Sequence, residues 1–365
     1  TTMTLSLFYC TALLSMLSGV GGQKPEPVRY HDQITKWRKS QEEDLKKDEG
    51  WLTVAGLFWL HEGENSVGTD ETSVVRLPTS AASGSVGVLT LQGGIVTLRL
   101  DSGVHAEHNG KPVSTLTMKS DKGGQPDRIL LQSVAFMVIE RGTRIGIRVY
   151  NRDARTRKEF TGLKWYEVKP TYRIVARFVP YTPPRQIAIT NVLGDTSLQS
   201  SPGYAAFTWK GKEFCLDALE SKEGLFFNFR DTTSGQTTYG AGRFLDAPKP
   251  TKGRVILDFN RATNPPCAFT PFATCPRPTR KNYLPIAIEA GEKPSSSYPS
   301  HSLALQYFSH SSSLTRSSRP QFDSSITASS GIAVHTFPVV ATPSGPSLSL
   351  VSHRPQSWPI VRPNP

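Results

Sequence analysis

The stretch that decides the fold is GSVGVLTLQGGIVTLRL, residues 84–100. In its second half the apolar Val96, Leu98 and Leu100 alternate with other residues, and this period of two is that of a β-strand with one buried face. The pair Gly93–Gly94 stands at the centre, where a tight turn needs residues that tolerate positive φ. The stretch therefore predicts a β-hairpin.

Short apolar runs of the same kind recur on both sides of this hairpin, punctuated by glycine, proline or Asn–Gly pairs. They lie at 51–60, 136–150, 172–178, 186–190, 203–209, 225–230, 239–244, 254–259 and 284–289. No helical pattern of ten residues separates them, which argues against a parallel α/β sheet. We therefore predict an all-β protein with two lobes, each built as a β-sandwich or barrel.

One amphipathic helix is expected before the strands, within residues 23–50. Ile34, Trp37 and Leu45 are its apolar positions among many charged residues, a pattern typical of a largely exposed helix. Prolines at 180–184 should interrupt strand pairing. They place a boundary between a first lobe at 51–179 and a second lobe at 180–293.

The N-terminus has the pattern of a secretory signal peptide at residues 1–22. An apolar run at 5–17 precedes a run of small residues at 18–22, and the apolar run is too short for a comfortable membrane span. We expect a secreted or extracytoplasmic protein with no stable membrane insertion after signal cleavage. The rival interpretation is an uncleaved membrane anchor.

The last part of the chain, residues 294–365, has a different composition. It contains 20 serines, many prolines and Asp323 as its single acidic residue. Such a segment buries too little apolar surface to offset its ordering entropy. We predict a disordered tail, with an O-glycosylated stalk as the alternative.

The formal net charge of +12 comes from lysines and arginines scattered along the chain. Nucleic-acid binding normally needs a basic stripe or a recognisable motif, and neither is visible. We therefore expect no nucleic-acid partner and interpret the charge as a solvated basic surface. The sequence gives no indication of the oligomeric state.

Several strings resemble the family known as domain of unknown function 1684. They include LTVAGLFWL at 52–60, FRDTTSG at 229–235, TYGAGRF at 238–244 and NPPCAFTP at 264–271. The resemblance extends over residues 30–293. It implies a common fold and carries over no activity, and the tail has no counterpart in it.

A second likeness covers residues 51–113, which are similar to forkhead-associated phosphopeptide modules. The likeness departs from that pattern at Thr69, where an arginine is expected, and no Ser-x-x-His string follows. Phosphopeptide recognition relies on such donors to the phosphate. The likeness therefore predicts a β-sandwich for the first lobe without phosphopeptide binding.

Polar residues that could carry chemistry gather at 228–283. The candidate catalytic residues are Asp258, Arg243, Arg230 and Tyr239. The candidate binding residues are Asp231, Thr233, Asn260, Arg261 and Asn264. Alternation along a strand points Asp258 and Asn260 the same way, and arginines facing carboxylates would make an oxyanion or carboxylate clamp. The alternative is structural, because Arg–Asp pairs often close loops through bidentate hydrogen bonds.

Cys267 and Cys275 stand eight residues apart in a proline-bracketed loop. We predict a disulfide between them, worth about 2–3 kcal/mol in the chain-entropy model. No Cys-x-x-Cys or histidine pair lies nearby, so no metal site is expected, and no cofactor is predicted. A nucleophilic cysteine would need a histidine from elsewhere, since none lies between His108 and His301.

Together these patterns predict an exported β protein that binds a small anionic or carbohydrate-like ligand in a polar cleft of the second lobe. One alternative is a hydrolase-like enzyme that uses Asp258 with Arg230 and Arg243. Another is a protein-interaction scaffold without a small-molecule site. The sequence contains no complete nucleophile, base and orienting group, so it does not decide whether the protein is an enzyme.

Overall fold

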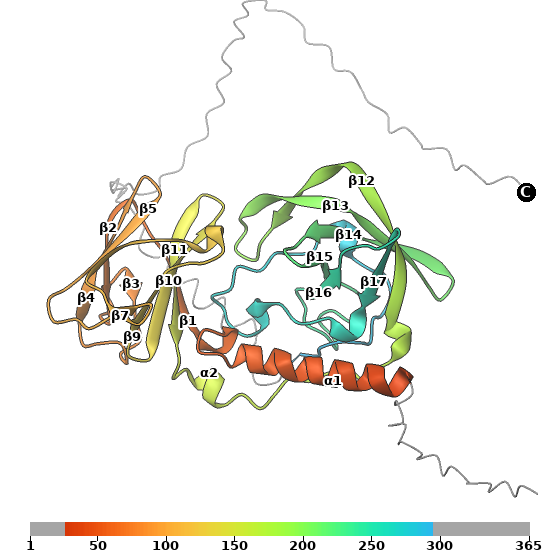
Figure 1. Ribbon diagram of the computed structural model, residues 1–365, viewed down its shortest axis with the longest axis horizontal. Helices are drawn as coiled ribbons and strands as arrows, with labels where there is room; N and C mark the ends of the chain where they lie inside the picture. Colours follow the sequence, from red (N-terminus) through yellow and green to blue (C-terminus); the bar gives the residue numbers. More distant parts are fainter. Residues whose placement is uncertain (1–25, 295–365) are drawn as a thin grey trace, which may run out of the picture. The chain divides into compact units, whose positions relative to one another are not determined.

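The computed structural model describes residues 26–294 of the 365-residue chain, and all of them belong to one compact unit. Strands dominate it, as Figure 1 shows, so the predicted all-β class is confirmed. The predicted signal peptide at 1–22 and nearly all of the predicted tail lie outside the described residues.

The predicted N-terminal helix is α1 (Glu26–Leu45). Its apolar side, with Tyr30, Ile34 and Leu45, is buried against the rest of the chain, while the other side carries the charged residues. Within residues 26–294, no helix is long and apolar enough to cross a membrane.

The first lobe consists of two sheets. One has the order β1-β11-β10-β9-β6-β7 and the other the order β3-β2-β4-β5-β8. The strands are β1 (Val54–Trp59), β2 (Gly63–Gly68), β3 (Val75–Arg76), β4 (Ser85–Gln92), β5 (Ile95–Leu100), β6 (Glu107–His108), β7 (Lys111–Pro112), β8 (Thr115–Met118), β9 (Arg128–Leu131), β10 (Val134–Arg141) and β11 (Arg144–Asn151).

The hairpin at 84–100 forms as predicted, with β4 and β5 antiparallel and positive φ at Gly93 and Gly94. Strands β10 and β11 form the hairpin expected at 136–150. The core of the lobe lies between its two sheets, where Ile147 and Val149 of β11 are fully buried. The alternate residues of β11 consequently lie on the other face of that sheet.

The second lobe is a six-stranded sheet in the order β16-β15-β14-β13-β12-β17, and its two edge strands contact each other, so that it nearly closes into a barrel. Its strands are β12 (Arg173–Thr190), β13 (Thr196–Trp209), β14 (Lys212–Glu220), β15 (Gly224–Phe229), β16 (Arg243–Pro248) and β17 (Arg254–Asp258). The interior is filled by aromatic and aliphatic side chains such as Phe227, Phe229 and Phe259.

Short helices lie before, between or after the strands. They are η1 (Trp51–Thr53), η2 (Asp121–Gly123), α2 (Arg155–Lys158), η3 (Pro170–Tyr172), η4 (Phe259–Arg261), η5 (Pro266–Ala268) and η6 (Arg280–Asn282). The loop at 262–279, which includes η5, matters most for function because it joins the second lobe to a sheet of the first.

Three details differ from the sequence-based expectations. Residues 284–289 form no strand, and β16 begins only at Arg243 rather than at residue 239. The proline-rich stretch 180–184 lies inside β12, where the register with β13 shifts between Pro180 and Arg185. A long strand can absorb prolines at such an irregularity, because no ladder hydrogen bond is needed there.

Candidate functional site

Arg148 is the centre of the candidate site. It lies on β11, opposite Leu57 of β1 and Met137 of β10. Because Ile147 and Val149 point into the core of the first lobe, Arg148 projects from the opposite face of the sheet. That face is covered by the second lobe, and Arg148 is only 3% exposed.

The cover is the loop at 262–279. Phe272 packs against the apolar part of the sheet face, Thr270 Oγ1 donates to the Val54 carbonyl at 3.4 Å, and Thr274 Oγ1 accepts from Arg141 Nε at 2.9 Å. Between loop and sheet the packing leaves a cavity of about 340 Å³, a size typical of small-molecule sites.

The cavity wall combines cationic, anionic, neutral polar and apolar residues. Arg141 and Arg148 supply positive charge. Asn191, Ser197, Gln199 and Thr274 supply neutral polar groups, and Asp195 supplies a carboxylate. Trp51, Ile189, Phe244, Pro266 and Pro276 supply apolar surface. The wall is therefore mixed, with polar groups that can orient a ligand and apolar surface against which its organic part can pack.

Two donors of Arg148, Nε and Nη2, have no hydrogen-bond partner among residues 26–294. Their N–H bonds point in parallel from one edge of the guanidinium plane, the edge that binds both oxygens of a carboxylate or phosphate at once. Burial lowers the pKa of Arg148, and the charge of Arg141 lowers it further, while the neighbouring Tyr150 acts in the opposite direction. A buried cation with open donors is costly to the fold unless an anion meets it.

Arg141 and Arg144, two further arginines on this sheet face, are paired. Arg141 Nη2 lies 2.7 Å from Asp121 Oδ2, and Arg144 forms an ion pair with Asp195, which also accepts from Asn191 Nδ2 at 3.0 Å. Arg148 is therefore the arginine of this face that has no ion pair in the described part of the chain. The arrangement can bind one anionic group.

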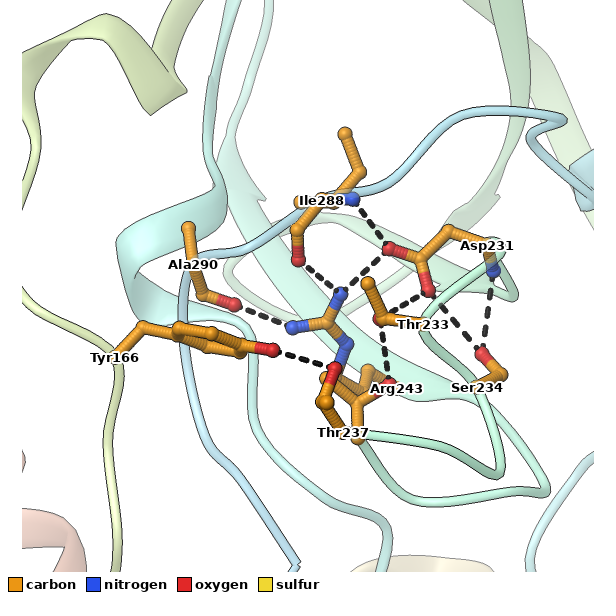
Figure 2. A network of polar contacts seen from close by, with 9 residues as sticks. Tyr166, Asp231, Thr233, Ser234, Thr237, Arg243, Ile288 and Ala290 are labelled. Carbon is orange, nitrogen blue, oxygen red and sulfur yellow. Dashed lines mark hydrogen bonds and ion pairs between the residues drawn. The ribbon is translucent and has the colours of Figure 1, made fainter.

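The residues predicted from sequence lie elsewhere. Arg243 and Asp231 form a fully buried ion pair at 2.9 Å, which Figure 2 shows with its surroundings. Arg243 also donates to the carbonyls of Ala290 and Ile288, and Asp231 accepts from Thr233 Oγ1 at 2.7 Å and from the Ile288 N–H at 2.8 Å. This network fastens the irregular segment after residue 284 to the barrel.

Asp258 and Asn260 do lie together, around the hydroxyl of Tyr30 on α1. That hydroxyl donates to Asp258 Oδ1 at 2.7 Å and accepts from Asn260 Nδ2 at 3.0 Å. Asn260 also binds the backbone of Lys169, and Arg261 Nε lies 3.7 Å from Asp258 Oδ2. The cluster connects the helix to the end of β17.

The remaining candidates are dispersed. Arg230 lies over the ring of Tyr283, at 5.3 Å from its centroid. The hydroxyl of Tyr239 donates to the Cys267 carbonyl at 3.0 Å. Asn264 donates through its backbone and its side chain to both carboxylate oxygens of Glu292, each at 2.8 Å.

The structure therefore does not bring the predicted residues together in one cleft, as had been expected for Arg230, Tyr239, Arg243, Asp258 and Asn260. They belong to separate clusters, and none of them lines the Arg148 cavity. Their catalytic or binding role stays a prediction. Among residues 26–294 no three His, Cys, Asp or Glu side chains are grouped as a metal ion would require.

Cys267 and Cys275 are both free thiols, so the predicted disulfide is not formed in this structure. Their loop does bring them together: the backbone N–H of Cys267 donates to Cys275 Sγ at 3.1 Å. Cys215 lies on β14 and is half-buried.

Sequence reasoning missed Arg148 because it stands outside the polar segment at 228–283. A signal existed, since Arg148 is the one charged residue within the run IGIRVY at 145–150. A charge at the centre of a strand with a buried face needs a partner or a ligand.

The comparisons find a resemblance to a known family over one part of the chain. Residues 158–293 match the family described as "Protein of unknown function (DUF1684)", so the resemblance to it is confirmed over that part of the chain. The match leaves out residues 30–157 of the range expected from the sequence. No curated protein matches.

Among solved structures, one neighbour is an uncharacterized protein of Haloarcula marismortui. It is 29% identical, with a TM-score of 0.33, over 39% of this chain and 82% of its own. Two others are FHA domains. One comes from a study of phosphothreonine-dependent FHA domain interactions (20% identity, TM-score 0.19, 26% and 92% coverage). The other is the FhaA FHA domain in a complex (20% identity, TM-score 0.19, 26% and 96% coverage).

Proposed function

We propose that this chain, which resembles the DUF1684 family over residues 158–293, is a binding protein for a small organic carboxylate held by Arg148. The single observation that carries the proposal is an arginine, 3% exposed and lining a cavity, whose Nε and Nη2 have no hydrogen-bond partner among residues 26–294. A carboxylate fits that edge with two parallel charge-assisted hydrogen bonds.

The wall favours a singly charged ligand. Arg141 already forms an ion pair with Asp121, and the carboxylate of Asp195 lies on the cavity wall. A phosphate dianion would therefore face one open guanidinium edge and a nearby negative charge. A carboxylate brings one charge to that edge and leaves its organic part for Phe244 and Pro266.

The hairpin formed by β12 and β13 supplies the groups that would select among carboxylates. Asn191, Ser197 and Gln199 belong to this hairpin and line the cavity. Their amide and hydroxyl groups suit hydroxyl or amide substituents on the ligand. The predicted export, with its expected place outside the cytoplasm, remains part of this proposal.

The test is a thermal-shift and calorimetric titration of the purified chain with acetate, benzoate, 4-hydroxybenzoate and inorganic phosphate. We expect saturable stabilisation by the aromatic carboxylates, lost in Arg148→Met and kept in Arg76→Met, which removes an exposed arginine of β3. Saturable binding of phosphate alone would overturn the choice of carboxylate. Equal responses of both variants would overturn the site.

A further inference from the structure

The wall of the Arg148 cavity also contains the thiol of Cys275, which has a second free cysteine, Cys267, beside it. Cys275 lines the cavity and is buried, whereas Cys267, eight residues earlier in the same loop, is half-buried. Next to Cys267, Pro266 lines the cavity too.

The backbone around both cysteines is held in place. The Cys275 carbonyl accepts from the Val192 N–H at 2.9 Å, and the neighbouring Pro276 carbonyl accepts from Asn228 Nδ2 at 2.7 Å. On the other side, the Cys267 carbonyl accepts from the Tyr239 hydroxyl at 3.0 Å. These contacts keep the two residues next to each other.

The sulfur of Cys275 lies 3.1 Å from the backbone nitrogen of Cys267. That nitrogen is one bond away from the Cys267 Cα, so rotation of the Cys267 side chain about its Cα–Cβ bond brings its own sulfur toward that of Cys275. A disulfide needs this proximity of the two side chains. The two cysteines are thus neighbours in space, and closing a disulfide between them requires this side-chain rotation.

We propose that Cys267 and Cys275 are a redox-active dithiol that exchanges with small disulfides. The Cys267 thiolate attacks one sulfur of a small disulfide such as oxidised glutathione, and the first glutathione leaves as a thiolate that takes up a proton. Cys275 then loses its proton and attacks the Cys267 sulfur, which releases the second glutathione. One glutathione disulfide is reduced to two thiols, and two cysteines are oxidised to one disulfide.

The surroundings of the two thiols indicate which cysteine attacks the small disulfide and which one resolves the mixed disulfide. The thiol of Cys275 and the Tyr239 hydroxyl hydrogen-bond to Cys267 and lower its pKa, whereas burial raises the pKa of Cys275. The more exposed thiol is thus also the better thiolate, as an attacking cysteine requires. Cys275 is the resolving partner.

The experiment treats the native full chain with oxidised glutathione, followed by alkylation, proteolysis and mass spectrometry. We expect the wild type and Cys215→Ser to give a linked Cys267–Cys275 peptide. Cys275→Ser should stop at a stable glutathione adduct on Cys267, formed at least about tenfold faster than any adduct on Cys215.

Two results would overturn the dithiol. One is a Cys267–Cys275 linkage that appears only after denaturation, and the other is glutathione on Cys215 while both loop cysteines stay free. The reaction is run without any carboxylate, so its failure leaves the binding proposal standing, and failure of the ligand titration leaves the dithiol standing.

Discussion

The guanidinium carbon of Arg148 lies 4.9 Å from the centroid of the Trp51 ring. An aromatic face attracts a cation without occupying its N–H donors. The ring thus holds the guanidinium in the interior of the protein, while Nε and Nη2 have no hydrogen-bond partner in the described part of the chain. Arg144 has a similar relationship with Trp59, at 4.0 Å, but forms an ion pair with Asp195 as well.

Breaking the buried Arg243–Asp231 pair should destabilise the protein strongly. Arg243→Met leaves Asp231 buried without its cation, and removing one partner of a buried pair costs about 3–5 kcal/mol. Denaturant unfolding measures this loss. Arg155→Met, which removes one partner of an exposed pair, is the control and should change little. An unchanged free energy of unfolding in Arg243→Met would contradict a structural role.

The free energy of unfolding should depend on pH through the titration of Glu292. Burial raises the pKa of Glu292 to about 8 in the folded chain, whereas an unfolded glutamate titrates near 4.3. Between these values the folded state keeps a proton that the unfolded state has lost, so stability falls as the pH rises through this window.

Glu292→Gln, which is neutral at every pH, should remove that fall. Unfolding midpoints measured from pH 5 to pH 8 would show a flatter profile for Glu292→Gln than for the wild type, while the exposed Glu64→Gln should follow the wild type. Parallel profiles for all three proteins would mean that Glu292 is ionised in the folded state.

Tyr30→Phe should loosen helix α1. It removes the donor to Asp258 and the acceptor of Asn260, and an unsatisfied buried group costs about 1–3 kcal/mol. Hydrogen exchange of the α1 amides, measured by mass spectrometry, should accelerate. Exchange unchanged from the wild type would show that the hydroxyl does not anchor the helix.

Asp258→Asn separates the structural role of this cluster from the hydrolase-like alternative. The structure predicts a lower melting temperature, because the Tyr30 hydroxyl then loses its carboxylate acceptor. The enzyme hypothesis instead predicts an unchanged melting temperature and the loss of turnover on an ester, phosphate or glycoside. A panel of such substrates with both proteins distinguishes the two.

The fold was largely predictable because its signals are local. The hairpins at 84–100 and 136–150 follow from alternation and glycine placement, and α1 follows from a periodic apolar face. Residues 284–289 look like a strand but form none. Part of this segment is held instead by hydrogen bonds to the side chains of Arg243 and Asp231. The alternation of apolar residues along one segment contains no information on such long-range contacts.

The candidate site was much less predictable. Polar residues near 228–283 could be found by density, but their partners, such as Tyr30 for Asp258, are more than two hundred positions away. The cavity depends on one loop of the second lobe covering a sheet face of the first. The only sequence signal for this cavity was the isolated charge of Arg148 between the apolar Ile147 and Val149.

The most direct test of the central claim is the thermal unfolding of the wild type and Arg148→Met in the same carboxylate-free buffer. A buried arginine that binds a ligand destabilises the folded chain when no ligand is bound. Arg148→Met should therefore melt at a higher temperature, and its free energy of unfolding should be higher by roughly 1–4 kcal/mol. A lower melting temperature for Arg148→Met would mean that Arg148 stabilises the folded chain by itself, and would contradict its assignment to a bound anion.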